Sequence, residues 1–242
     1  MISNAFLDRV QLKRESIESL DVYPFSLPAV QAMDALKLHP KVTFLIGENG
    51  SGKSTILEAI AVASGFNAEG GTKNFNFSTA STHSTLHEHI RLAKGLRAPR
   101  DGFFLRAESF YNVATQIDTL GVGEYYGGKS LHTLSHGEAF LALMMNRFGG
   151  KGLYLLDEPE AALSPARQLA VLGRIHALVG DQSQFIIATH SPMLMAYPDA
   201  WIYECSAAGL QRVSYDDTQH VKITRDFLAN PQRMLDELFK GD

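Results

Sequence analysis

The segment that most restricts the fold is Gly47–Ser54, which reads GENGSGKS. It matches the pattern G-x-x-x-x-G-K-S/T, in which a glycine-rich turn wraps main-chain N–H groups around phosphate oxygens. An apolar run, Val42–Ile46, precedes the segment, and a helical pattern, Ser54–Ala63, follows it. The pattern requires this strand–turn–helix context, because the start of the helix adds its positive dipole to the anion site. The sequence therefore predicts a phosphate-binding loop within an α/β fold.

The residues of this loop have distinct expected roles. Those expected to bind the nucleotide are Asn49, Gly50, Ser51, Gly52, Lys53, Ser54 and Thr55. The Lys53 ammonium would reach the β- and γ-phosphates, and the Ser54 hydroxyl would ligate Mg²⁺. The loop alone thus predicts nucleotide binding.

Two carboxylates, Asp157 and Glu158, directly follow another apolar run, Leu153–Leu156. At the end of a strand, Asp157 is expected to ligate the same Mg²⁺. Glu158, one residue further, is expected to face the γ-phosphate and polarise the attacking water. The alternative is a strand that ends in two solvated acids, and the phosphate loop upstream disfavours it.

The remaining apolar runs extend the α/β pattern. Val42–Ile46, Gly152–Leu156 and Gln184–Ala188 are continuous runs that suit strands buried on both faces, and Phe103–Arg106 is a weaker strand candidate. Turn residues and a helical pattern follow each of the first three, which is typical of a sheet with crossover helices. Near the C-terminus, Pro231 divides a helical stretch into two pieces.

Residues 66–135 are expected to form a small peripheral lobe, because this stretch is irregular and begins with many Gly, Ser, Thr and Asn residues. A polar helix is expected over Thr85–Lys94. His83 and His87 have the spacing of a metal-binding pair, but no cysteine or carboxylate cluster completes such a site, so a solvated helix face is favoured. A basic and aromatic stretch contains Lys94, Arg97, Arg100, Phe103, Phe104 and Arg106, and a surface loop is favoured there over a nucleic-acid contact.

Composition excludes several classes of protein. The chain has 242 residues, 45% of them apolar, and a net charge of −4, which indicates no bulk attraction to nucleic acid. Its single cysteine, Cys205, excludes an internal disulfide. The longest apolar run, Ala139–Met145, is far shorter than the ~20 residues that span a bilayer. The first residues do not have the pattern of a signal peptide. We therefore expect a cytoplasmic protein without membrane insertion.

Five motifs occur in the order found in ABC-type ATPases. They are Gly47–Thr55 (GENGSGKST), Leu134–Glu138 (LSHGE), Leu153–Glu158 (LYLLDE), Pro159–Pro165 (PEAALSP) and Thr189–Ser191 (THS). The chain therefore resembles an ABC-type ATPase head over about residues 40–195, and it is most similar to compact stand-alone bacterial ATPases of the RecF and SMC-like branch. The resemblance implies a single P-loop NTPase domain over residues 1–242, with a mixed β-sheet flanked by helices. It also implies ATP and Mg²⁺ as ligands and a homodimer that closes head-to-tail around two ATP molecules.

The resemblance assigns further site residues. Ser135 and Gly137 correspond to the signature serine and glycine, which would contact the γ-phosphate held by the partner subunit. His136 and Glu138 depart from the usual LSGGQ pattern, in which a glycine and a glutamine occupy these positions. His190 corresponds to the switch histidine that senses the γ-phosphate.

Two roles have alternative candidates. ABC-type ATPases usually have a glutamine beside the metal. Glu108 is the candidate for this role here, and Gln116 is a poorer candidate. The aromatic residue that stacks on adenine is represented by Tyr23, with Phe25 as the alternative.

The implied function is a Mg²⁺-dependent ATP-binding and hydrolysing switch that acts on a separate effector protein or on DNA, in repair or defence. An energising subunit of a membrane transporter is the second candidate. The segment between Glu108 and Ser135 argues against it, because it has room for little more than one helix. A nucleotide-gated binding module with little turnover is the third, and the altered signature LSHGE supports it.

Overall fold

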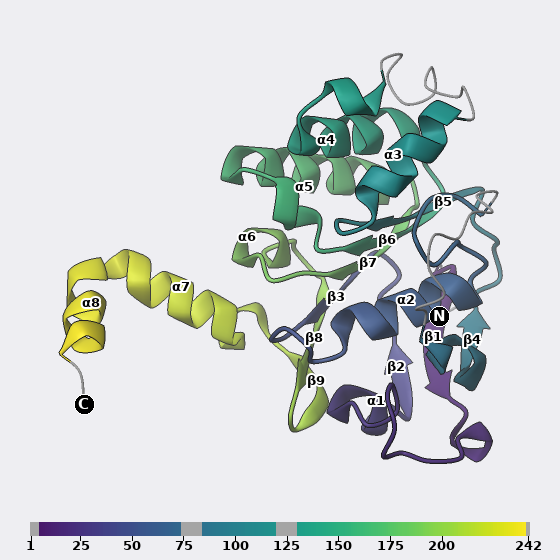
Figure 1. The fold of residues 1–242 in the computed structure, drawn as a ribbon, viewed down its shortest axis with the longest axis horizontal. Helices are drawn as coiled ribbons and strands as arrows, with labels where there is room; N and C mark the ends of the chain where they lie inside the picture. The colour runs from purple at the N-terminus through teal and green to yellow at the C-terminus, as the bar shows by residue number, and fades with distance from the viewer. Residues whose placement is uncertain (1–4, 74–83, 120–129, 241–242) are drawn as a thin grey trace.

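The centre of the molecule is a six-stranded sheet, seen in a computed structural model that describes residues 5–73, 84–119 and 130–240 (Figure 1). In spatial order the strands are β5 (Asp101–Arg106), β6 (Gly152–Asp157), β7 (Gln184–Ala188), β3 (Val42–Ile46), β8 (Trp201–Ser206) and β9 (Gly209–Val213). The first five are parallel, and β9 pairs antiparallel with β8. The α/β fold predicted from the sequence is confirmed, with strands at all four of the expected runs.

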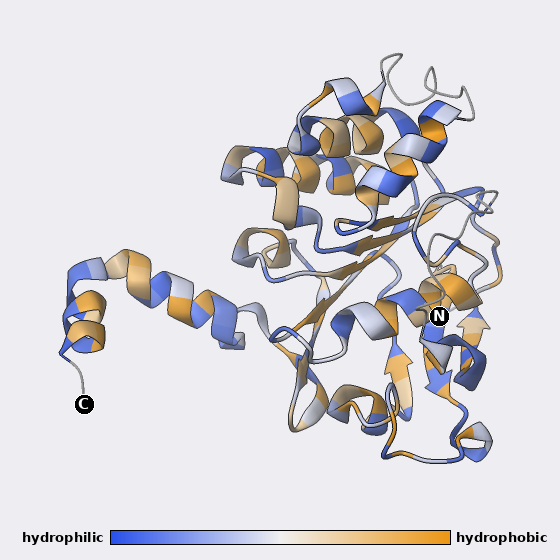
Figure 2. Ribbon diagram, viewed as in Figure 1, coloured by the Kyte–Doolittle hydropathy of each residue, from blue (hydrophilic) through white to orange (hydrophobic). Residues whose placement is uncertain are grey.

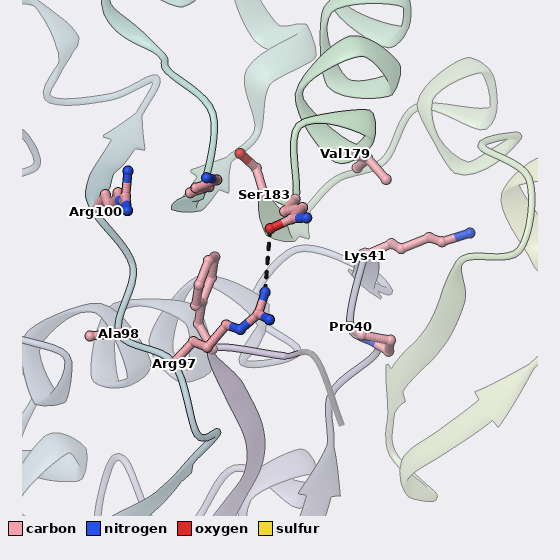
Figure 3. Close-up of a pocket in the computed structure, with 10 residues that line it drawn as sticks. Pro40, Lys41, Arg97, Ala98, Arg100, Val179 and Ser183 are labelled. Atoms are coloured by element: carbon pink, nitrogen blue, oxygen red, sulfur yellow. Dashed lines mark hydrogen bonds between the residues drawn. The ribbon is translucent and has the colours of Figure 1, made fainter. Parts of the chain in front are cut away.

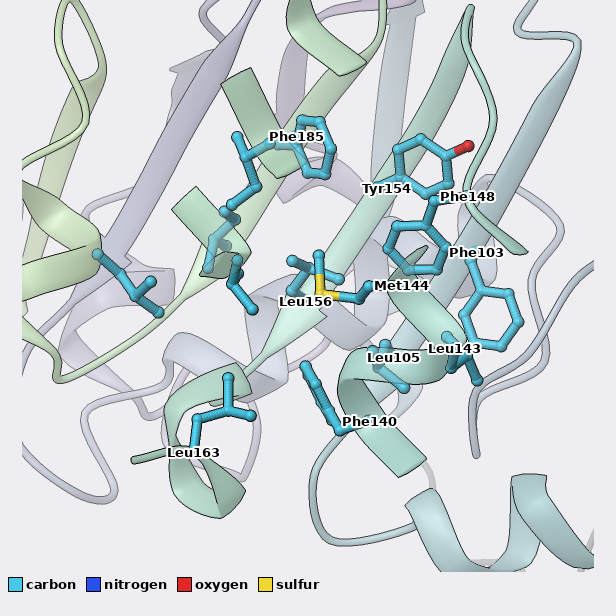
Figure 4. Close-up of a cluster of buried hydrophobic side chains, with 14 of the residues drawn as sticks. Phe103, Leu105, Phe140, Leu143, Met144, Phe148, Tyr154, Leu156, Leu163 and Phe185 are labelled. Carbon is cyan, nitrogen blue, oxygen red and sulfur yellow. The ribbon is translucent and has the colours of Figure 1, made fainter. Parts of the chain in front are cut away.

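Helices cover both faces of this sheet. Those of the body are α1 (Pro28–Gln31), α2 (Lys53–Ala63), α3 (Phe110–Thr119), α4 (His136–Arg147), α5 (Pro165–Gly180) and α6 (Pro192–Met195). Along β6, Tyr154 and Leu156 pack into the core that contains α3, α4 and α5, whereas Leu153 and Leu155 pack into the core that contains α2. Figure 4 shows the first of these cores. In Figure 2 the strands of the sheet are coloured as hydrophobic along most of their length, as expected for burial on both faces.

A polar cluster closes one end of the first core. The Asp101 carboxylate accepts hydrogen bonds from the Tyr154 hydroxyl at 2.8 Å and from Arg147 Nη1 at 2.8 and 2.9 Å. The Tyr154 ring itself stacks on Phe148 at 4.3 Å between centroids. Burial raises the pKa of Asp101, but the hydrogen bond from Tyr154 and the charge of Arg147 outweigh it, and the net pKa lies below the usual range.

A smaller antiparallel sheet lies against the other side of α2. Its strands, in spatial order, are β2 (Ala35–Lys37), β1 (Leu7–Leu12) and β4 (Ile90–Lys94). The helix expected over Thr85–Lys94 is therefore wrong, because a 3₁₀ helix, η2 (Thr85–His89), is followed there by a strand. Ile90 and Leu92 alternate with more exposed residues, and pairing with β1 satisfies the main chain, so tertiary packing decides the conformation.

Residues 66–135 contribute to more than one part of the molecule. Strand β4 joins the small sheet, and β5 forms an edge of the main sheet. Helix α3 buries Val113 and Ile117 in the first core. His83, one of the two histidines with metal-like spacing, lies outside the described residues.

The C-terminal helices project from the body as an extension (Figure 1). They are α7 (Gln219–Ala229) and α8 (Pro231–Phe239), divided at Pro231 as the sequence predicts. Val221 is the buried residue of α7, and the helices expose Ile223, Phe227, Leu228, Leu238 and Phe239. Within the described ranges, the helices are all too short or too polar to cross a membrane.

Candidate nucleotide site

The predicted site residues meet where three adjacent parallel strands end. The glycine-rich loop follows β3, Asp157 and Glu158 lie at the end of β6, and His190 follows β7. Since β6, β7 and β3 are neighbours in the sheet, their carboxyl ends share one edge. This is the edge at which open α/β sheets bind ligands.

The loop before α2 has the conformation that its glycines permit. Gly47, Gly50 and Gly52 have φ angles of +136°, +76° and +101°, which residues with a side chain rarely adopt. At Gly47 a Cβ atom would also lie 2.1 Å from the Cys205 carbonyl oxygen on β8. The loop therefore depends on glycine both for its turn and for its close approach to the sheet.

Lys53, the first residue of α2, turns its side chain back into this loop. Its Nζ donates hydrogen bonds to the carbonyl oxygens of Gly47 and Glu48, both at 3.0 Å. The residue is only 3% exposed, and burial lowers the pKa of its ammonium, while the carboxylate of Glu158 raises it. An anion inside the loop would meet a cation with little competing hydration.

Ser54 and Asp157 form a direct contact across the site. The Ser54 hydroxyl donates to Asp157 Oδ1 at 2.8 Å. Burial raises the pKa of Asp157 to about 6, although the nearby charge of Arg106 opposes this shift. A hydroxyl beside a buried carboxylate is an oxygen donor pair of the kind that Mg²⁺ prefers, so these residues fit the expected metal.

Arg106, at the end of β5, links Asp157 to two other carboxylates. Its guanidinium is 2.6 Å from Glu58 on α2 and 3.6 Å from Asp157 Oδ2, and it also contacts Glu108. Arg106 lies in a stretch that the sequence predicts to be a surface loop, but its side chain is only 13% exposed. The signal available in the sequence was a charged residue, Glu58, within the apolar pattern of α2.

Glu158 and His190 face each other beside the metal-binding pair. Glu158 has a left-handed backbone (φ 49°, ψ 52°), and its N–H donates to the Ala188 carbonyl at 2.9 Å. Its carboxylate lies 3.4 Å from His190 Nε2. The turn at the end of β6 thus aims the carboxylate at the residue that follows β7.

Two residues that sequence reasoning missed hold His190. The main-chain N–H of His190 donates to Glu160 Oε1 at 2.5 Å, and its ring Nδ1 lies 3.2 Å from Nε2 of His220 at the start of α7. Burial and the charge of His190 lower the pKa of His220. Glu160 belongs to the quoted motif PEAALSP, whereas His220 lies beyond the segment that resembles the ATPases and offered no signal.

Polar atoms without a partner concentrate around this site. Among the described residues, seven buried side-chain nitrogen or oxygen atoms make no hydrogen bond, and five of them belong to Ser51, Arg106, Glu160, His190 and His220. Native proteins satisfy nearly all such atoms, so a cluster of exceptions is a mark of a functional site. A cavity of about 620 Å³ adjoins it, between residues 47–51, the β8–β9 turn and the first turn of α7.

The signature residues lie at the start of α4. Ser135 caps this helix, and Glu138 accepts hydrogen bonds from the Ser135 N–H at 3.0 Å and from its hydroxyl at 2.6 Å. Arg167 binds the other oxygen of Glu138 at 3.1 Å. A Cβ on Gly137 would lie 2.4 Å from the Ala162 carbonyl, so packing within the chain itself requires this glycine.

The candidates with alternatives are placed as follows. Tyr23 is 64% exposed, and its hydroxyl lies 3.3 Å from that of Thr55, whereas Phe25 is buried with its ring edge-on to His89. Glu108 is exposed and contacts Arg106 rather than Ser54 or Asp157. Gln116 lies within α3.

Two family models match the chain. One, described as an AAA domain, matches residues 31–112, and the other, described as "AAA domain, putative AbiEii toxin, Type IV TA system", matches residues 137–196. The first contains the glycine-rich loop on β3, and the second contains the acidic pair on β6 and His190 after β7. Both models describe AAA domains, and the segments they match hold these parts of the candidate site.

Solved structures that resemble the chain include a subunit of an ABC transporter complex and an SMC head. The cbiO1 protein of Clostridium perfringens, part of the ABC transporter complex cbiONQ, is 16% identical over 86% of this chain and 91% of its own chain, with a TM-score of 0.46. The SMC head domain from Thermotoga maritima is 17% identical over 86% and 98%, also with a TM-score of 0.46. No curated protein matches this chain by sequence.

Proposed function

We propose that this chain is an ABC-type ATPase head, which binds ATP with Mg²⁺ and hydrolyses the bond to its γ-phosphate. The observation that carries the proposal is the convergence of Lys53, Ser54, Asp157, Glu158 and His190 at the ends of three adjacent strands. Phosphoryl transfer needs mainly positioning and charge stabilisation, and this set supplies an anion loop, a cation, an oxygen pair for a metal and a base.

Binding of the phosphates involves a change of partners for Lys53. Its Nζ now bonds two carbonyl oxygens of the loop, and phosphate oxygens inside the loop offer stronger, charge-assisted acceptors. The main-chain N–H groups from Asn49 to Thr55 then surround the β- and γ-phosphates. Ser54 and Asp157 would hold Mg²⁺, which would supply positive charge to neutralise the phosphate oxygens.

Arg106 acts as a positioning residue for Asp157. Burial alone favours the neutral carboxyl of Asp157, and the guanidinium opposes this by favouring the ionised form that a cation needs. Glu58 on the other side of the guanidinium holds it in place.

Glu158 is the proposed general base. It accepts a proton from water as the water oxygen attacks the γ-phosphorus and the bond to the β-phosphate oxygen breaks, which yields ADP and phosphate. His190 lies 3.4 Å from the same carboxylate; Glu160 holds its main-chain N–H, and His220 contacts its ring. We propose that His190 contacts both the water and the γ-phosphate.

The proposed active form is a homodimer in which each copy presents Ser135 and Gly137 to the ATP of the other. In the monomer the Ser135 hydroxyl is bound to Glu138, so a contact to phosphate requires this bond to open. The negative charge of Glu138 disfavours a phosphate nearby. This feature supports the alternative of a nucleotide-gated module with little turnover.

The proposed output is movement of a separate effector, either a protein or DNA, in repair or defence. The C-terminal extension supports coupling to a protein effector. Its first turn carries His220, in contact with His190, and its two helices expose large apolar side chains. An energising subunit of a transporter remains the alternative output.

A phosphate-release assay with ATP and Mg²⁺ tests the proposed reaction. Glu158→Gln should lower the rate by about 10²-fold or more, and Lys53→Ala should also weaken nucleotide binding. Lys37→Ala, which removes an exposed lysine on β2, is the control and should change neither. Wild-type release no faster than that of both site variants would overturn the ATPase proposal, and tight ATP binding without release would support the binding module instead.

A further inference from the structure

A second cavity, of about 640 Å³, lies at the amino ends of the strands of the main sheet (Figure 3). Lys41 precedes β3, Arg100 precedes β5, Lys151 precedes β6 and Ser183 precedes β7, and all four residues line it. These strands are adjacent and parallel, so their amino ends gather at one place. The nucleotide site lies at their carboxyl ends, which makes the two sites separate.

The charge of this cavity has one sign. Its lining includes four cationic side chains, from Lys41, Arg97, Arg100 and Lys151, and the described lining contains no carboxylate. Within the described part of the chain, none of the four forms an ion pair. In a chain with a net charge of −4, such a gathering of unpaired cations is a local concentration of positive potential.

The main chain that carries these cations is held in place by hydrogen bonds. The Arg100 N–H donates to the Lys151 carbonyl at 2.9 Å, and the Lys151 N–H donates to the Asp181 carbonyl at 2.8 Å. Lys151 and Gln182 have φ angles of 58° and 64°, which are uncommon for residues with a side chain. Arg97 reaches across the cavity to Gln182 at 3.4 Å, the dashed contact of Figure 3. The cations are therefore attached to a largely preformed frame.

Apart from Gln182 and Ser183, the remaining lining is apolar. Phe6, Pro40, Ala98 and Val179 supply hydrophobic surface beside the cations. The volume lies within the range of small-molecule sites, which combine an apolar lining with a few polar groups. Arginine side chains are particularly suited to phosphate groups, which they bind through two parallel hydrogen bonds.

We propose that this cavity binds a nucleotide-sized ligand that carries two or more phosphate groups. The cations bind the phosphates, and the apolar wall accommodates the organic part. A free nucleotide polyphosphate and the phosphorylated end of a nucleic-acid strand share this chemistry. The proposal is independent of the phosphate loop, so Lys53→Ala protein, in which the loop is disabled, is the background for its test.

Two probes distinguish the sources of the ligand. Inorganic tripolyphosphate is titrated by calorimetry, and a fluorescent oligothymidine with a 5′-phosphate is titrated by anisotropy. The pocket variant is Lys41→Ala with Arg100→Ala. The matched control is Lys37→Ala with Arg91→Ala, which removes one exposed lysine and one exposed arginine from the small sheet.

We expect the pocket variant to weaken binding at least about tenfold, because two charge-assisted contacts are lost, and the control to leave it unchanged. For the oligonucleotide, the slope of log affinity against log salt should fall by about 1.4, or about 0.7 for each lost phosphate contact. Weakening with both probes supports a free polyphosphate as the ligand. Weakening with the oligonucleotide alone supports the same site with a strand end as the ligand.

Two results would overturn the proposal: neither probe binds, or the pocket and control variants bind equally. The titrations are repeated on the wild-type loop with excess Mg-ADP. This second condition keeps the test valid if Lys53→Ala lowers the stability of the fold.

Discussion

We expect Arg106→Met to be among the most destabilising single substitutions in this chain. The Arg106 and Glu58 side chains are 13% and 11% exposed and lie 2.6 Å apart. Methionine preserves much of the volume of the side chain but leaves the Glu58 carboxylate buried without its cation. It also removes the charge that opposes the raised pKa of Asp157. The loss in folding free energy is therefore that of removing one partner of a buried ion pair.

The magnitude follows from that geometry. Removal of one partner of a buried pair costs about 3–5 kcal/mol. In a domain of this size, 1 kcal/mol lowers the melting temperature by about 2–4 °C, so the expected shift is about 10 °C. Thermal unfolding followed by circular dichroism measures it directly.

Two further variants separate this explanation from a general loss of packing. Adding Glu58→Met to Arg106→Met should restore part of the stability, because no carboxylate is then left unpaired at Glu58. Glu108→Ala removes the exposed partner of the same arginine and should cost less than about 1 kcal/mol. If Arg106→Met shifts the melting temperature no more than Glu108→Ala does, the reasoning about this network is wrong.

Three other predictions follow from the same structure. Glu138→Gln should strengthen ATP-dependent dimerisation, because the neutral side chain can still accept the hydrogen bonds of Ser135 without placing a negative charge near phosphate. Sedimentation velocity with Mg-ATP measures the association, and an unchanged association would contradict this prediction. His220→Ala should lower kcat for ATP more than it raises KM, because His190 loses an orienting partner, and a change in KM alone would argue against that role. Asp101→Asn should lower the melting temperature at pH 7, because a carboxyl with a depressed folded pKa stabilises the protein above its unfolded pKa of about 3.9. The effect is lost as pH falls through the folded pKa, so the difference between variant and wild type should shrink in acid. A pH-independent difference would refute that assignment.

The sequence predicted the parts of the fold that follow from local rules. The strands at Val42–Ile46, Gly152–Asp157 and Gln184–Ala188 are buried on both faces, so continuous apolar runs identified them. The glycine-rich loop was predictable because its backbone conformation limits which residues it accepts. The convergence of the loop with Asp157, Glu158 and His190 then follows from the parallel arrangement of these strands.

What the sequence did not predict depends on contacts between distant segments. The segment Thr85–Lys94 has a polar pattern that suits a helix, and only pairing with β1 makes its second half a strand. Arg106 and Glu58 are 48 positions apart, so the charged residue within the apolar pattern of α2 signals a buried partner but does not identify it. His220 reaches His190 because α7 begins beside the loop, which is a matter of tertiary placement.

The most direct test of the central claim is light scattering of Glu158→Gln protein, with and without Mg-ATP. This substitution keeps the size of the side chain while removing the proposed base, so bound ATP should persist. The account predicts a mass of 26.6 kDa without nucleotide and about twice that value with Mg-ATP. A protein that binds ATP but stays monomeric under both conditions would contradict the proposal that two copies close around the nucleotide.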